Sequence, residues 1–125
     1  MKQSTSSRSK QYLENLGWLY GKTEMPWNRF TKVRKDLFGI CDGIAIKDKR
    51  IMCIQDCNGN GDFGAHVKKI QGNPLFPIVA NAIPIYVMTW AIRGARGKQK
   101  KWTVKLFNLF NDSVVEITEP ENYLN

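Results

Sequence analysis

The sequence has no long apolar run, only one histidine and only three cysteines in 125 residues. No stretch approaches the roughly 20 apolar residues that a membrane-spanning helix requires, so a membrane protein is not expected. The N-terminal segment, MKQSTSSRSKQ, lacks the apolar core of a signal peptide. A small, odd number of cysteines does not suggest a disulfide framework. We therefore expect a reduced, intracellular protein.

Basic residues are absent from the C-terminal end of the chain. Every Lys and Arg lies at or before Lys105, although the whole chain carries a net charge of +8. Such an excess favours a polyanionic partner, and nucleic acid is the common one, with DNA expected rather than RNA. The alternative is a basic surface that serves solubility. Four of the eleven acidic residues follow the last cation: Asp112, Glu116, Glu119 and Glu121.

The length allows one domain with a substantial core, residues 1–125. Tyr12, Leu13 and Leu16 recur at helical spacing, and Gly17 is a suitable helix end. Apolar and aromatic runs between turn residues predict strands, and their few interior charges predict an α/β fold whose sheet is covered on both faces. Residues 1–5 are expected to be flexible, and the acidic tail, 111–125, to be peripheral. The predicted helices span 6–16 and 63–70, with a further helical turn in 74–82, and the predicted strands span 18–24, 36–47, 51–57, 83–92 and 101–109.

Two polar residues interrupt the predicted apolar strands. Asp42 lies inside FGICDGIAI and Gln55 inside IMCIQDC. A charge among apolar neighbours costs free energy unless it is paired or bound to a metal. With a turn at 48–49, the two strands form a hairpin that brings Asp42 close to Gln55. Oxygen ligands on adjacent strands, completed by water, are the usual way in which proteins hold Mg²⁺.

This arrangement resembles the PD-(D/E)xK nuclease superfamily, the restriction-endonuclease-like fold. Within it, the sequence is most similar to small phage and archaeal Holliday-junction-resolvase-like nucleases. The family motif is an Asp early in the second strand and Glu-x-Lys on the third, and Asp42, Gln55 and Cys57 occupy these positions. The stretch RKDLFG, which contains Asp36, and the upstream Glu24 are also similar to the phage-type members.

The resemblance covers roughly residues 6–107 and implies an αβββαβ core with a central mixed sheet flanked by helices. It implies a metal-dependent DNA endonuclease that uses Mg²⁺ or Mn²⁺, acts on Holliday junctions or other branched DNA and works as a homodimer. It also implies an intracellular setting, such as a phage-encoded protein in a bacterial host.

The chain departs from the family motif at two positions. Gln55 can bind a metal only through its carbonyl oxygen, and Cys57 cannot supply the cation that orients the attacking water. The resemblance therefore implies that a lysine of the following helix replaces the missing one, and that a further acid restores the missing charge. The residues assigned to catalysis are Asp42, Gln55, Asp36, Lys68, Lys69 and Glu24, and those assigned to the metal are Asp42, Gln55, Asp36 and Asp56 through its carbonyl.

Two groups of cations are candidate nucleic-acid contacts. One belongs to the stretch RGARGKQKK, expected to be a loop between two strands that contacts phosphates without reading bases. The alternative is a solvated loop. The other group abuts the predicted site. Trp27, Trp90 and Trp102 can stack on bases, although core packing is the commoner role. The first group comprises Arg93, Arg96, Lys98, Lys100 and Lys101, and the second Arg29, Lys32, Arg34 and Lys35.

The glycine-rich stretch IQDCNGNGDFGAH matches three cofactor patterns in part. A calcium loop is excluded because Val67 stands at the position that requires a bidentate Glu. A zinc site would have only Cys53, Cys57 and His66, with no fourth ligand nearby. A dinucleotide-binding turn would need a βαβ unit and an acid about 20 residues further on. We therefore predict a flexible turn between a strand and a helix.

Two other functions fit the same residues. Loss of the motif Glu and Lys is expected of a nuclease-fold protein that binds nucleic acid without cutting it. A phage accessory protein whose basic surface contacts an acidic host protein is the third candidate.

Overall fold

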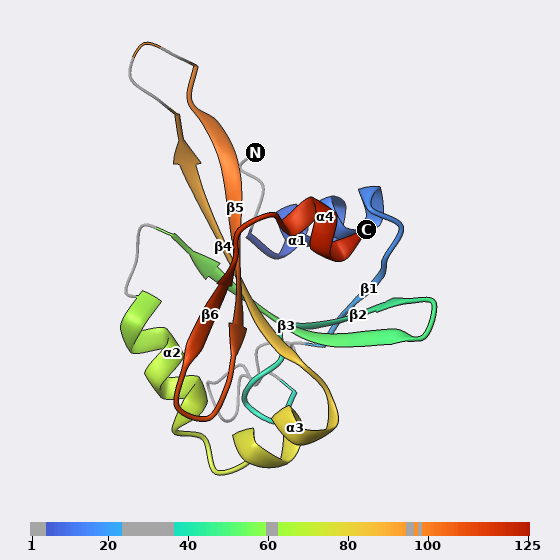
Figure 1. The fold of residues 1–125 in the computed structure, drawn as a ribbon, viewed down its shortest axis with the longest axis vertical. Coiled ribbons are helices and arrows are strands. Elements are labelled where there is room, and N and C mark those ends of the chain that lie inside the picture. The colour runs from blue at the N-terminus through green and yellow to red at the C-terminus, as the bar shows by residue number, and fades with distance from the viewer. Residues whose placement is uncertain (1–4, 24–36, 60–62, 95–96, 98) are drawn as a thin grey trace, which may run out of the picture.

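The computed structural model describes residues 5–23, 37–59, 63–94, 97 and 99–125. Six strands form one mixed sheet in the order β1-β2-β3-β4-β5-β6 (Figure 1). All neighbouring strands are antiparallel except β3 and β4, which are parallel. The strands are β1 (Leu19–Lys22), β2 (Gly43–Lys47), β3 (Arg50–Asn58), β4 (Ile85–Arg93), β5 (Lys101–Leu109) and β6 (Val114–Ile117).

Helices cover both faces of this sheet. Helices α1 (Thr5–Asn15) and α4 (Pro120–Leu124) lie on one face, and α2 (Phe63–Gln71) and α3 (Phe76–Ala82) on the other (Figure 1). The last two form the crossover that parallel strands such as β3 and β4 require. None of the helices in the described part of the chain has the length and apolar character needed to cross a bilayer.

Each face has its own apolar core. In β4, Tyr86 and Met88 belong to the core under α1 and α4, whereas Ile85 and Val87 belong to the core under α2 and α3. This division follows from the two-residue period of a strand. The predicted α/β class, with a mixed sheet between helices, is confirmed. The helical end at Gly17 is confirmed too, since its φ of 92° is a conformation that favours glycine.

The long strand predicted for 36–47 is wrong over its first half. Strand β2 starts at Gly43, and Leu37 and Cys41 close a tight turn by exchanging backbone hydrogen bonds of 3.1 and 3.0 Å. Phe38 and Gly39, inside the turn, have positive φ angles. Of the apolar residues that suggested a strand, Ile40 and Cys41 fill the core from the turn, where both are fully buried, whereas Leu37 and Phe38 are exposed.

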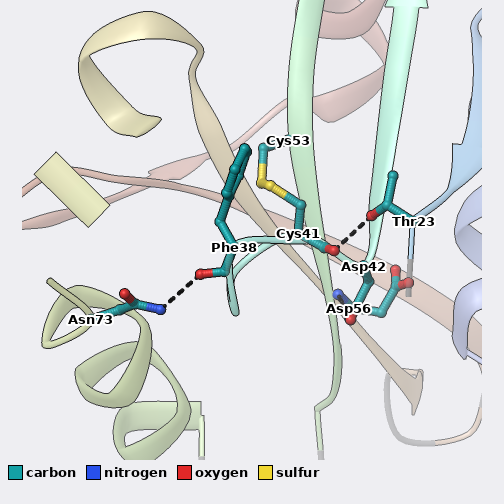
Figure 2. Close-up of a disulfide and its surroundings, with 7 residues drawn as sticks. All are labelled: Thr23, Phe38, Cys41, Asp42, Cys53, Asp56 and Asn73. Carbon is teal, nitrogen blue, oxygen red and sulfur yellow. Dashed lines mark hydrogen bonds between the residues drawn. A yellow bond between two sulfur atoms is a disulfide. The ribbon is translucent and has the colours of Figure 1, made fainter. Parts of the chain in front are cut away.

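The small, odd number of cysteines did not suggest a disulfide framework, but the structure contains one disulfide. Cys41 and Cys53 form a disulfide with a Cα–Cα distance of 5.5 Å, which leaves Cys57 as a buried thiol (Figure 2). The tight turn brings Cys41 over β3, a proximity that sequence spacing does not reveal. Asn73 holds the turn from the other side by donating to the carbonyl of Phe38 at 3.0 Å. The inference of a reducing compartment depended on free thiols and loses that basis.

The acidic tail, expected to be peripheral, is part of the fold at the edge of the sheet. It adds β6 to the edge of the sheet and places α4 over the core of the α1 side. Leu124 is fully buried, and its carbonyl accepts a 2.8 Å hydrogen bond from the indole of Trp18. The acids of the tail stay exposed, so charge alone was a poor guide to the position of the segment.

Candidate functional site

Asp42 lies in the bend immediately before β2, between β1 and β3 (Figure 2). Its backbone N–H donates to Ile54 at 2.8 Å, and its carbonyl accepts from the N–H of Thr23 at 2.9 Å. Its carboxylate accepts the backbone N–H of Asp56 at 2.9 Å. The carboxylate of Asp42 thus accepts the backbone N–H of Asp56 in place of a backbone carbonyl of a neighbouring strand, at the point where the chain bends before β2. Asp42 is held by the backbone of both neighbouring strands.

Strand β3 separates two residues that were assigned to one site. Gln55 lies on the α2/α3 face with Cys53 and Cys57, as the two-residue period predicted. Asp56 points to the opposite face, where its carboxylate meets residues of α1. The side chains of Gln55 and Asp56 therefore lie on opposite sides of the sheet, whereas the predicted metal site used only the backbone carbonyl of Asp56.

Hydroxyl groups surround the carboxylate of Asp56. Ser6 donates to it at 3.0 Å, Tyr20 donates at 3.4 Å, and Ser9 donates at close range. Ser9 is fully buried and accepts a 2.9 Å hydrogen bond from the indole of Trp90. One network therefore joins α1, β1, β3 and β4, and it accounts for the otherwise unfavourable burial of a carboxylate.

Burial dominates the electrostatics of this network. It raises the pKa of Asp56 above the ordinary value of 3.8, while hydrogen bonds from Ser9, Ser6 and Tyr20 lower that pKa in part. Burial, followed by the charge of Asp56, also raises the pKa of Tyr20, so its phenol remains a donor. On the other side of β3, burial raises the pKa of the Cys57 thiol, and the charges of Asp42 and Asp56 add to this effect. Cys57 is therefore a poor nucleophile.

A lysine not singled out in the sequence, Lys22, acts on the carboxylate of Asp56. Lys22 pairs with Gly43 in the β1–β2 ladder, and its charge lowers the pKa of Asp56. It follows Tyr20 by two residues, so both side chains project from the same face of β1. By contrast, Lys68 and Lys69 are exposed in the last turn of α2, which covers the other face. In the sequence, the two-residue spacing between Tyr20 and Lys22 could have indicated that both side chains lie on the same face of this strand.

Gln55 is only 6% exposed, and its Oε1 atom is buried without a hydrogen-bond donor from any described residue. An unsatisfied buried acceptor costs about 1–3 kcal/mol. Its carbonyl oxygen has the chemistry of a metal ligand. Within the described ranges, no group of three His, Cys, Asp or Glu side chains is arranged to hold a metal ion.

The described cations of the predicted nucleic-acid contacts lie where β4 and β5 extend together beyond the other strands (Figure 1). Arg93 is tied to this arm, because it donates to the carbonyl of Thr103 at 2.7 Å and to its hydroxyl at 3.0 Å. Lys100 and Lys101 are exposed. The predicted residues outside the described ranges are Glu24, Trp27, Arg29, Lys32, Arg34, Lys35, Asp36, Arg96 and Lys98.

Comparison with known proteins assigns no family to the chain. The sequence matches no family model and no curated protein, and the fold matches no solved structure. Function is therefore argued from the chemistry of Asp42, Asp56 and their neighbours.

Proposed function

We propose that the protein is a metal-dependent DNA endonuclease of the PD-(D/E)xK type, in which Asp42 and Asp56 form the acidic pair. The observation that carries the proposal is the hydrogen bond that the backbone N–H of Asp56, in the second half of β3, donates to the carboxylate of Asp42, just before β2. The charge of Lys22 acts on the same Asp56 carboxylate. The element order supports it. After α1 come three antiparallel strands, a helical crossover and a strand parallel to β3, which is the order that the resemblance implies.

The acidic pair differs by one residue from the motif Asp42, Gln55 and Cys57. A shift of one position along a strand moves a side chain to the opposite face of the sheet. Shifted in this way, the third-strand motif is Asp56-x-Asn58, on the face that also carries Lys22. The cation that the motif places on the third strand then comes from β1, and no lysine of α2 is needed.

Asp42 and Asp56 suit Mg²⁺ or Mn²⁺, because both ions prefer carboxylate oxygens and complete their shells with water. The serine hydroxyls around Asp56 can rotate, and an ionised carboxylate has about four acceptor positions, so the network can admit a further partner. A bound ion would supply an activated water and neutralise charge on the phosphate. Lys22 would stabilise the negative charge that develops on the phosphate. Branched DNA as the substrate, dimer formation, and assistance from Glu24 or Asp36 rest on the resemblance alone.

Cleavage of plasmid and four-way-junction DNA with Mg²⁺ or Mn²⁺ tests the proposal. Asp42→Asn and Lys22→Ala are each expected to lower the cleavage rate by about 10²-fold or more, as removal of a group that stabilises the transition state does. The matched control is Lys68→Ala combined with Lys69→Ala, which should cleave at the wild-type rate.

The proposal fails if wild-type protein leaves both DNAs intact with either ion. If instead the Lys68 and Lys69 control loses activity while Lys22→Ala keeps it, the assignment of the cation is wrong and a lysine of α2 fills that role.

A second candidate is a protein of the same fold that binds nucleic acid without cutting it. Its supporting observation is that Asp56 is already hydrogen bonded by three hydroxyls, while Cys57 stands where the motif has Lys. Under this alternative, DNA binding weakens steeply with salt and does not change when EDTA removes divalent ions. Filter binding from 50 to 200 mM salt, with and without EDTA, separates the two candidates.

A further inference from the structure

Two tryptophans on neighbouring strands differ sharply in exposure. Trp90 is 7% exposed and donates its indole N–H to Ser9, so it is a core residue. Trp102 lies on β5 and is 43% exposed, and its partner across the ladder, Ile92, is 51% exposed. Trp90 and Trp102 lie on the face that α1 covers, towards the end of the sheet where the β4–β5 arm projects (Figure 1). A half-exposed indole leaves part of its ring available to a ligand.

Trp102 forms one wall of a small pocket. The guanidinium of Arg8 lies 3.8 Å from the centroid of the Trp102 ring, a cation–π contact that holds the indole in place. Gln11 and Asn15, one helical turn apart on α1, present exposed side-chain amides along the same pocket. Its volume is about 250 Å³, and its lining comprises Arg8, Gln11, Tyr12, Asn15, Trp90 and Trp102.

The pocket adjoins the network of Asp56. Trp90 lines the pocket and also donates to Ser9, which in turn donates to Asp56. Tyr12 packs edge-on against Trp90, with 5.7 Å between ring centroids. Burial, and after it the charge of Glu121, raise the pKa of Tyr12, so an acid faces that side of the pocket. An anionic ligand is therefore expected to approach from the side of Arg8.

We propose that this pocket is a stacking site for one unpaired base of single-stranded nucleic acid, with an adjoining phosphate on Arg8. An aromatic face beside a cation suits the binding of single strands, and amide side chains can hydrogen bond to base edges. A duplex is a poor ligand for the pocket, because its bases already stack on one another. The inference deepens the proposed function by naming the substrate as DNA with an unpaired segment.

Fluorescence anisotropy in EDTA tests this site without cleavage. The probes are a labelled oligothymidylate, an abasic strand of the same length and a duplex of the same length. Trp102→Ala should weaken binding of oligothymidylate by about 5- to 100-fold, the effect of losing one stacked base, and leave abasic and duplex binding unchanged. Trp102→Phe should keep most of the affinity. Ile92→Ala, the exposed neighbour across the ladder, is the matched control and should bind like the wild type.

The stacking site is overturned if Trp102→Ala binds oligothymidylate as the wild type does, or loses affinity for all three probes equally. It is also overturned if the wild type binds oligothymidylate no more tightly than the abasic strand. That result is expected if the pocket instead receives an aromatic side chain of a protein. These binding measurements do not depend on whether Asp42→Asn loses cleavage. The nuclease proposal and the stacking site can therefore fail separately.

Discussion

Strand β3 separates two unlike polar environments, although Gln55 and Asp56, which define them, are neighbours in the chain. Asp56 is partly buried among three hydroxyl donors from α1 and β1. Gln55 is buried with Cys53 and Cys57 on the other face, and its carbonyl oxygen meets no donor from the described residues. The side of the sheet, more than the residue type, determines whether a buried polar group finds partners.

The two faces are also held together differently. On the α1 side, hydrogen bonds from helix to strand join segments 47 and 50 residues apart in the chain. On the α2/α3 side, the Cys41–Cys53 disulfide fastens the tight turn to β3 (Figure 2). A disulfide closing a loop of this size typically stabilises a domain by about 3 kcal/mol. Asp42 follows Cys41 directly, so its position depends on both faces.

The strongest test of the contrast is Asp56→Ala. We expect the free energy of unfolding to fall by about 3 kcal/mol, because three hydroxyls lose their common acceptor and a cavity remains. Urea denaturation monitored by circular dichroism measures the change. Glu14→Ala, an exposed acid on the α1 helix, is the control and should change stability by less than about 0.5 kcal/mol. Equal effects of the two variants would show that the hydroxyl network contributes nothing.

A pH comparison gives a smaller effect on the same face. Because the folded-state pKa of Asp56 is raised above 3.8, protonation favours the folded state. Its contribution is fully present below pH 3.8 and is lost as pH rises through the folded pKa. Asp56→Asn removes this titration and leaves the other carboxylates unchanged. The stability of wild type relative to Asp56→Asn should therefore decrease from pH 3.5 towards neutrality, and an increase would contradict the raised pKa.

The smallest effect is expected on the opposite face, from Gln55→Met. Methionine has a similar length and removes a buried acceptor without a described donor, so the free energy of unfolding should rise or stay within about 1 kcal/mol. The melting temperature and the urea midpoint measure it. A loss of more than about 2 kcal/mol would show that the amide of Gln55 is hydrogen bonded after all, and the two faces would then be alike.

Local patterns were sufficient for most helices and strands. The predicted strand 101–109 agrees with β5, and the helix predicted for 6–16 agrees with α1 to within one residue at each end. The predicted hairpin turn at 48–49 is confirmed, since β2 ends at Lys47 and β3 begins at Arg50. Periodicity and turn residues carry this information locally. The tight turn at 37–41 was missed because an apolar run has the same composition in a buried turn as in a strand.

The sequence alone determined the α/β class, the order of the main elements and the basic character of the chain, because each depends on local spacing or on composition. Only the tertiary structure decided that Asp56 shares a face with Ser6, Ser9 and Lys22, and that Cys41 reaches Cys53. The physical reason is the pleat of the strand. One residue of register selects the face, and the partners on that face come from segments far away in the chain.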